Sequence, residues 1–140
     1  MKPLLRRLLR WSSDDRGIIG PAVTMVLVVA LAGGGLVYDG GRALVARRQA
    51  INTAEAAARA GASTVTADGL RQDPARAATL EFLDAAGVAR SDIVNITVTP
   101  ATVTVIIRVS RDAVFGQLLG NDRIVVRGDG EATATFGGGP

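Results

Sequence analysis

The apolar run from Ile18 to Tyr38 constrains this chain more than any other feature, because its 21 residues include no charged side chain. A helix rises about 1.5 Å per residue, so this run would extend about 31 Å, close to the hydrocarbon thickness of a bilayer. Trp11 and Tyr38 flank it, as aromatic rings do at membrane interfaces. Pro21 lies in the first helical turn, where a missing N–H costs little. The run therefore predicts one transmembrane helix over residues 18–38.

The tail before the run predicts the orientation of that helix. Residues 1–17 hold five cations, which are opposed by Asp14 and Asp15 alone. The cytoplasmic flanks of membrane helices carry such an excess of Lys and Arg. We therefore expect a single-pass protein of the cell membrane, with a cytoplasmic N-terminus and an extracytoplasmic C-terminal domain. The five cations are Lys2, Arg6, Arg7, Arg10 and Arg16.

A cleaved signal peptide is the alternative interpretation of the same segment. A basic stretch precedes the apolar run, and Ala30-Leu31-Ala32 matches the small-residue cleavage site of secreted proteins. The apolar run continues from Gly33 to Tyr38 beyond that site, and its length suits a span better than the core of a signal peptide. A retained anchor is therefore the favoured interpretation.

The composition excludes several classes of function. The sequence of 140 residues contains no cysteine and no histidine, which removes disulfides, the commonest metal ligands and the usual general base. After Tyr38, 11 Arg balance 11 acidic residues, so nothing indicates a basic surface for nucleic acid. We therefore predict no catalytic, cofactor or metal site. The expected partners include neither nucleic acid nor a small-molecule substrate, and the protein is not expected to be an enzyme.

Strong helix formers follow the apolar run, from Arg42 to about Val65. Small residues, among them Ala54, Ala58 and Gly61, recur at helical spacing and form a narrow stripe. Such a stripe buries little apolar area, so the helix needs a closely packed partner. We predict that Ala54, Ala58 and Gly61 pack against a helix of another subunit. Removal of residues 1–38 is then expected to leave this helix partly disordered.

Two shorter helical segments are indicated further along the chain. Asp73 suits an N-cap, Pro74 the first helical position and Gly87 the C-terminal stop of a second helix. The stretch from Ala113 to Leu119 predicts one or two further helical turns, closed by Gly120. The second helix has a modest apolar side, which suits packing on a sheet.

Alternating β-branched residues predict strands over residues 93–98 and 103–109, joined by a hairpin turn. A third strand is expected over 123–127 and 131–136, with an interruption at Gly128-Asp129-Gly130, since glycine weakens a strand. Arg127-Gly128-Asp129 also spells an integrin-type tripeptide, but a match of three residues arises easily by chance.

These elements define an α+β fold, in which a long N-terminal transmembrane helix continues into an Ala-rich helix. A small antiparallel sheet with one packed helix follows. The predicted organisation is a basic tail over residues 1–17, a transmembrane helix over 18–38, a helical stalk over 39–66, a small extracytoplasmic α+β domain over 67–136 and a disordered tail over 137–140.

The order of motifs around the apolar run resembles the TadE/TadG-like proteins of tight-adherence (Flp-type) pilus assembly, especially the short forms of high-GC Gram-positive bacteria. An Arg-Gly precedes the helix, a D-x-G-R follows it, and a Gln leads into an Ala-rich helix. The matching residues are Asp15, Arg16, Gly17, Asp39, Gly41, Arg42 and Gln49. The resemblance is specific over residues 14–62 and only architectural over residues 63–140.

This resemblance implies a structural role, either as a minor pilin or pseudopilin or as a membrane-anchored assembly factor. Its partners would be the membrane and, through helix packing, other pilins or pilus-assembly proteins. It also implies prepilin-type processing between Gly17 and Ile18, although Ala22 stands where such pilins typically carry a glutamate. The alternative is a membrane-anchored extracytoplasmic module that binds an envelope ligand.

Overall fold

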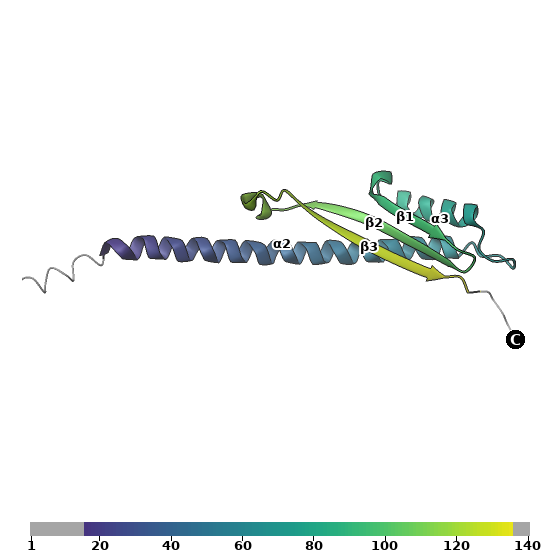
Figure 1. Cartoon of the computed structure of the whole chain (residues 1–140), viewed down its shortest axis with the longest axis horizontal. Coiled ribbons are helices and arrows are strands. Elements are labelled where there is room, and N and C mark those ends of the chain that lie inside the picture. Colours follow the sequence, from purple (N-terminus) through teal and green to yellow (C-terminus); the bar gives the residue numbers. More distant parts are fainter. Residues whose placement is uncertain (1–15, 136–140) are drawn as a thin grey trace, which may run out of the picture. The chain divides into compact units, whose positions relative to one another are not determined.

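The computed structural model describes residues 16–135 and confirms the α+β fold class (Figure 1). Over these residues it contains a long helix, a shorter helix, two 3₁₀ turns and three strands. In chain order the elements are α2 (Arg16–Ala62), α3 (Gln72–Ala85), η2 (Arg90–Asp92), β1 (Ile93–Val98), β2 (Thr102–Asp112), η3 (Gly116–Leu119) and β3 (Arg123–Thr133).

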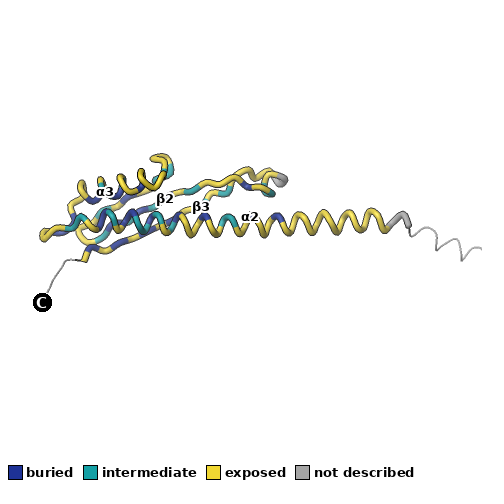
Figure 2. Tube along the Cα trace, turned by 180° about the vertical axis from the view of Figure 1, so that it is seen from behind, coloured by how far each residue is buried: buried dark blue, intermediate teal, exposed yellow. Residues whose placement is uncertain are grey.

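The chain divides into two compact units, Met1–Tyr38 and Asp39–Pro140. The part of α2 that belongs to the first unit contains the apolar run. The large side chains of this run are exposed (Figure 2). Only 6% of the most apolar window of this helix is buried, whereas the core helix of a soluble protein would be mostly buried. Among the described residues, this helix alone is long and apolar enough to cross a membrane, which fits a single-pass membrane protein.

The second unit is built on an antiparallel sheet of strand order β1-β2-β3. The predicted hairpin joins β1 and β2, with the Thr99 N–H donating to the Thr102 carbonyl at 2.8 Å. β2 and β3 pair along their whole length, from Thr102 opposite Thr133 to Asp112 opposite Arg123. The alternation of β2 buries Val103, Val105 and Ile107 on one face of the sheet.

That inner face holds the core of the second unit. α3 contributes Ala75, Thr79 and Leu83. It ends at Ala85, and the predicted stop Gly87 follows two residues later with a φ of +74°, which glycine adopts easily. The predicted N-cap at Asp73 is wrong, because the helix begins at Gln72 and Arg71 is its cap residue. α2 contributes its small residues to the same core: Ala50, Ala54, Ala57, Ala58 and Ala62.

The predicted interruption of the third strand is also wrong, because β3 runs unbroken from Arg123 to Thr133. Gly128 and Gly130 pair in regular register with Ile107 and Val105. Both glycines are buried on the inner face, while Asp129 between them is exposed. The tripeptide Arg127-Gly128-Asp129 is therefore part of a strand, not of a turn.

We expect a fragment of residues 39–140 to fold with its helix intact, contrary to the prediction from the sequence. The sheet and α3 already bury the small residues of α2, so removal of the first unit does not take away their partner. Amide hydrogen exchange of the fragment should show strong protection over residues 46–62. Rapid exchange there, with a protected sheet, would contradict this expectation.

Candidate functional site

The contact between α2 and β3 is close enough to exclude side chains on the strand. A Cβ atom built on Gly128 would overlap the backbone of Ala50 and Ile51. A Cβ built on Gly130 would overlap the backbone of Ala54 and Glu55. The helix backbone therefore lies directly on the strand backbone. Glycine makes this approach possible because it has no side chain to separate the two.

Gly61 makes the same kind of contact with α3. A Cβ at this position would meet the Thr79 side chain, and it would lie 3.0 Å from the Ala75 carbonyl oxygen. The Thr79 hydroxyl donates to that same carbonyl at 2.8 Å, so this buried polar group is satisfied. The predicted packing residues Ala54, Ala58 and Gly61 are thus all buried within the chain's own second unit. Their packing against another subunit stays a prediction, and it would require α2 to leave this sheet.

A second cluster of contacts lies at the start of the second unit, where the carboxylate of Asp39 accepts three backbone hydrogen bonds. The Val114 N–H donates to Oδ1 at 3.1 Å, and the Phe115 and Gly116 N–H groups donate to Oδ2 at 2.8 Å each. These donors lie in the connection between β2 and β3, about 75 residues away in sequence. We call this arrangement the Asp39 clasp. Asp39 is only 8% exposed, so the clasp replaces the water that its carboxylate would otherwise bind.

The clasp holds Asp39 in its charged form. Burial by itself would raise the pKa of Asp39, but the N–H donors of Gly116, Val114 and Phe115 and the charge of Arg42 outweigh burial and lower it. A lowered folded-state pKa means that the ionised carboxylate stabilises the fold. This contribution is complete above the ordinary carboxyl pKa of 3.8 and is lost as the pH falls through the lowered pKa.

We therefore expect Asp39→Asn to lower the melting temperature of the protein at pH 7, with a smaller difference from wild type in strong acid. The amide cannot offer two acceptor oxygens to three N–H donors, whereas protonation of the wild type removes the same advantage as the pH falls through the lowered pKa of Asp39. Thermal unfolding of both proteins from pH 7 down to pH 2 measures the difference. A constant difference over this range would show that the charge of Asp39 has no part in the clasp.

Comparison with protein families matches residues 17–64 to the Flp pilus-assembly TadE/G-like family. Over these residues the chain is similar to TadE/G-like proteins. The match covers about a third of the sequence, and it contains Asp39 and the small residues of α2 but not their partners in β3 and in the β2–β3 connection. Comparisons with curated proteins and with solved structures gave no match.

The residues that carry the resemblance to TadE/G-like proteins have different environments. Asp39 is in the clasp, and Arg42 acts on its charge. A Cβ on Gly41 would meet nothing within 4 Å, so no contact in the second unit requires glycine there. Gln49 is exposed on α2. Arg16, Gly17 and Ile18 form the first turn of α2 as the structure describes it, and Asp15 lies outside the described residues.

Gln49 borders an open groove of about 370 Å³ between α2, the end of α3 and β2. Its lining is mixed in character and includes Thr53, Asp92 and Arg111. Within residues 16–135 the structure shows no group of three residues suited to hold a metal ion. The groove therefore offers polar contacts to a ligand.

Sequence reasoning assigned Asp39 to a motif but missed what it binds. Its partners are backbone N–H groups, which leave no signature in side-chain chemistry. The available signal was indirect: Asp39 stands directly after an apolar run, where a carboxylate needs donors. The glycines of β3 carried a signal too, because two glycines spaced by two residues lie on the same face of a strand.

Proposed function

We propose that this protein is a membrane-anchored structural component of a Tad/Flp-type pilus or a related secretion system, with its N-terminus in the cytoplasm. The family match over residues 17–64 carries this proposal and supports a part in Flp pilus assembly. The exposed apolar helix fits membrane association, and the family is structural, not catalytic. The second unit then stands outside the cytoplasm as a small folded domain.

Between a minor pilin and a permanently anchored assembly factor, we favour the anchored factor. Ala22 stands where prepilin-type subunits typically carry a glutamate that assists assembly. In addition, the small-residue face of α2 that would suit side-by-side helix packing is covered by the chain's own sheet over residues 50–62. Both observations support a subunit that keeps its anchor.

The mass of the protein in its native cells tests this choice. We expect the membrane fraction to contain a chain whose N-terminal peptide extends through Gly17, and we expect sheared pili to lack the protein. A chain that begins at Ile18 and is recovered with sheared pili would instead identify a minor pilin. Loss of surface pili after deletion of the gene, restored by a plasmid copy, tests the part in assembly itself.

The orientation is tested separately with tags at the two ends. Five cations before the span predict that a protease added to intact cells without an outer barrier removes a C-terminal tag and spares one on Met1. A protease-resistant C-terminal tag on intact cells, degraded only after lysis, would show the opposite orientation.

A further inference from the structure

The connection between β2 and β3 combines apolar character with a fixed position. From Ala113 to Gly120 it contains no charged residue, and it includes Val114, Phe115 and the short η3 turn. Val114 is 49% exposed, although it is a large hydrophobic residue. Two charged residues flank this stretch in the sequence, Asp112 before it and Asp122 after it. We call residues 113–120 the apolar loop.

The Asp39 clasp fixes this loop to the first residue of the second unit. Three consecutive N–H groups of the loop lie within 3.1 Å of the Asp39 carboxylate. Asp39 is bonded to Tyr38, the last residue of the uncharged run. If residues 18–38 span the bilayer, the backbone of the loop can therefore lie only a few ångströms from the plane where the span leaves it.

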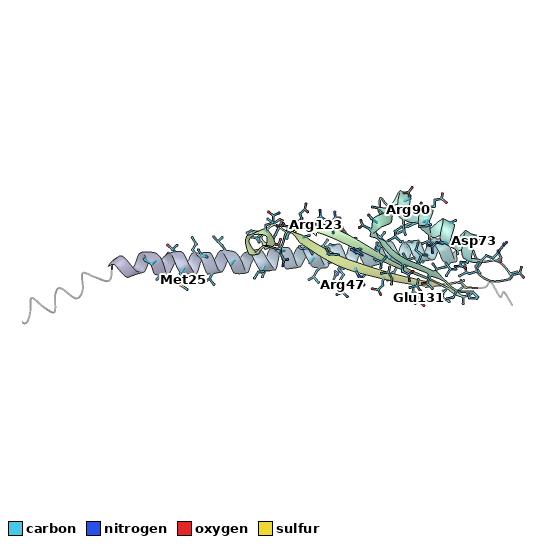
Figure 3. The ribbon with its side chains drawn as sticks, turned by 45° about the horizontal axis from the view of Figure 1, so that its top comes forward. Met25, Arg47, Asp73, Arg90, Arg123 and Glu131 are labelled. Carbon is cyan, nitrogen blue, oxygen red and sulfur yellow. The ribbon has the colours of Figure 1, made fainter. Side chains whose placement is uncertain are left out.

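The charges of the second unit support the same placement. The end near Asp39 carries five arginines: three within ten residues along α2, and two where β2 and β3 meet the loop. Figure 3 shows Arg123 near this end and Glu131 toward the other. Three acidic residues accompany the five arginines, and Asp39 among them is already bound in the clasp. The arginines are Arg42, Arg47, Arg48, Arg111 and Arg123, and the acidic residues are Asp39, Asp112 and Asp122.

The remainder of the unit has the opposite balance. Eight acidic residues outnumber six arginines in the remainder of the unit. A domain that is neutral overall thus has a basic end, which contains Asp39 and the apolar loop. Arginine and exposed apolar side chains together suit the interface of a bilayer, where phosphates lie above acyl chains.

We propose that the apolar loop enters the outer interface of the bilayer, with Val114 and Phe115 at the level of the upper acyl chains and Arg111 and Arg123 at the lipid phosphates. The occupant of this surface is lipid, because the loop is held at the point where the span leaves the membrane. The anchor is then supplemented by a second contact, which restricts how the domain tilts on its helix. This inference rests on residues 18–38 being retained in the membrane, not on the role in pilus assembly.

Tryptophan fluorescence in vesicles tests this placement. The full-length chain is reconstituted with Trp11→Phe, so that a single new tryptophan reports, either Val114→Trp or Gln117→Trp, both at exposed positions. The control is Thr97→Trp, which is exposed near the β1–β2 hairpin. The hairpin lies at the other end of the sheet from the apolar loop. At that end the Leu70 N–H donates to the Pro100 carbonyl, and α2 ends about 35 Å from Asp39.

The vesicles contain phosphatidylglycerol and a phosphatidylcholine brominated on its acyl chains, since bromine quenches tryptophan only at short range. We expect strong quenching of the reporters at positions 114 and 117 and little at position 97, relative to unbrominated vesicles. Equal emission with and without bromine at both loop positions would overturn the proposal and leave the loop free for a protein partner. Equal quenching at position 97 would also overturn it. Circular dichroism of each variant confirms the fold, and no pilus protein is present, so the result is independent of the proposed function.

Discussion

Gly130→Ala is expected to destabilise the second unit strongly, although it adds only one methyl group. The new Cβ would overlap the backbone of Ala54 and Glu55, and a backbone cannot rotate away as a side chain can. We expect a loss of stability at or above the upper end of the about 1–3 kcal/mol that overpacking usually costs. For a domain of this size, such a loss lowers the melting temperature by more than about 10 °C. Thermal unfolding followed by circular dichroism measures it.

Gly40→Ala is the matched control for this change. It adds the same methyl group to a helical glycine whose Cβ would meet nothing within 4 Å. The change should leave the melting temperature unchanged or raise it, because alanine favours a helix over glycine by about 1 kcal/mol. A Gly130→Ala protein as stable as wild type would show that α2 and β3 are further apart than described.

Ala58→Leu is the second change with a large expected effect, and it also distinguishes two roles of α2. Ala58 is fully buried against the chain's own core, so a larger side chain should destabilise the second unit by about 1–3 kcal/mol. In cells such a loss lowers the steady-state level several-fold, and surface pili should decline with the protein. Immunoblots of total protein and counts of surface pili in the same strain measure both.

Ala60→Leu, at a partly exposed position on the same helix, is the control for this change and should affect neither quantity. Normal abundance of the Ala58→Leu protein together with a loss of pili would point instead to a contact between subunits. Normal abundance with normal pili would show that this face of the helix is not closely packed at all.

The strands that alternate apolar and polar residues were predictable from the sequence. Ile93 to Val98 and the residues after Thr102 form strands because one face of each is buried, and that pattern is local. The end of α3 just before Gly87 was equally predictable, because a glycine at positive φ commonly follows the end of a helix. Such signals depend on residues within a few positions of one another.

The elements that were missed depend on contacts between distant residues. Gly128 and Gly130 weaken a strand in isolation, and only the approach of α2 makes them necessary there. The small residues of α2 correctly indicated a closely packed partner. The sequence near them does not show that this partner is a strand of the same chain. The bonds of Asp39 to Val114, Phe115 and Gly116 likewise join segments about 75 residues apart.

The pairing of α2 with β3 also determines how the second unit responds to mechanical force. The contacts advance together along both elements, with Gly128 at Ala50 and Gly130 at Glu55, so the helix and the strand run in the same direction. A pull between Asp39 and the end of β3 at Thr133 therefore loads this contact lengthwise. All its small-residue contacts resist sliding at once, instead of opening one after another. The second unit is therefore built to resist a pull along its long helix.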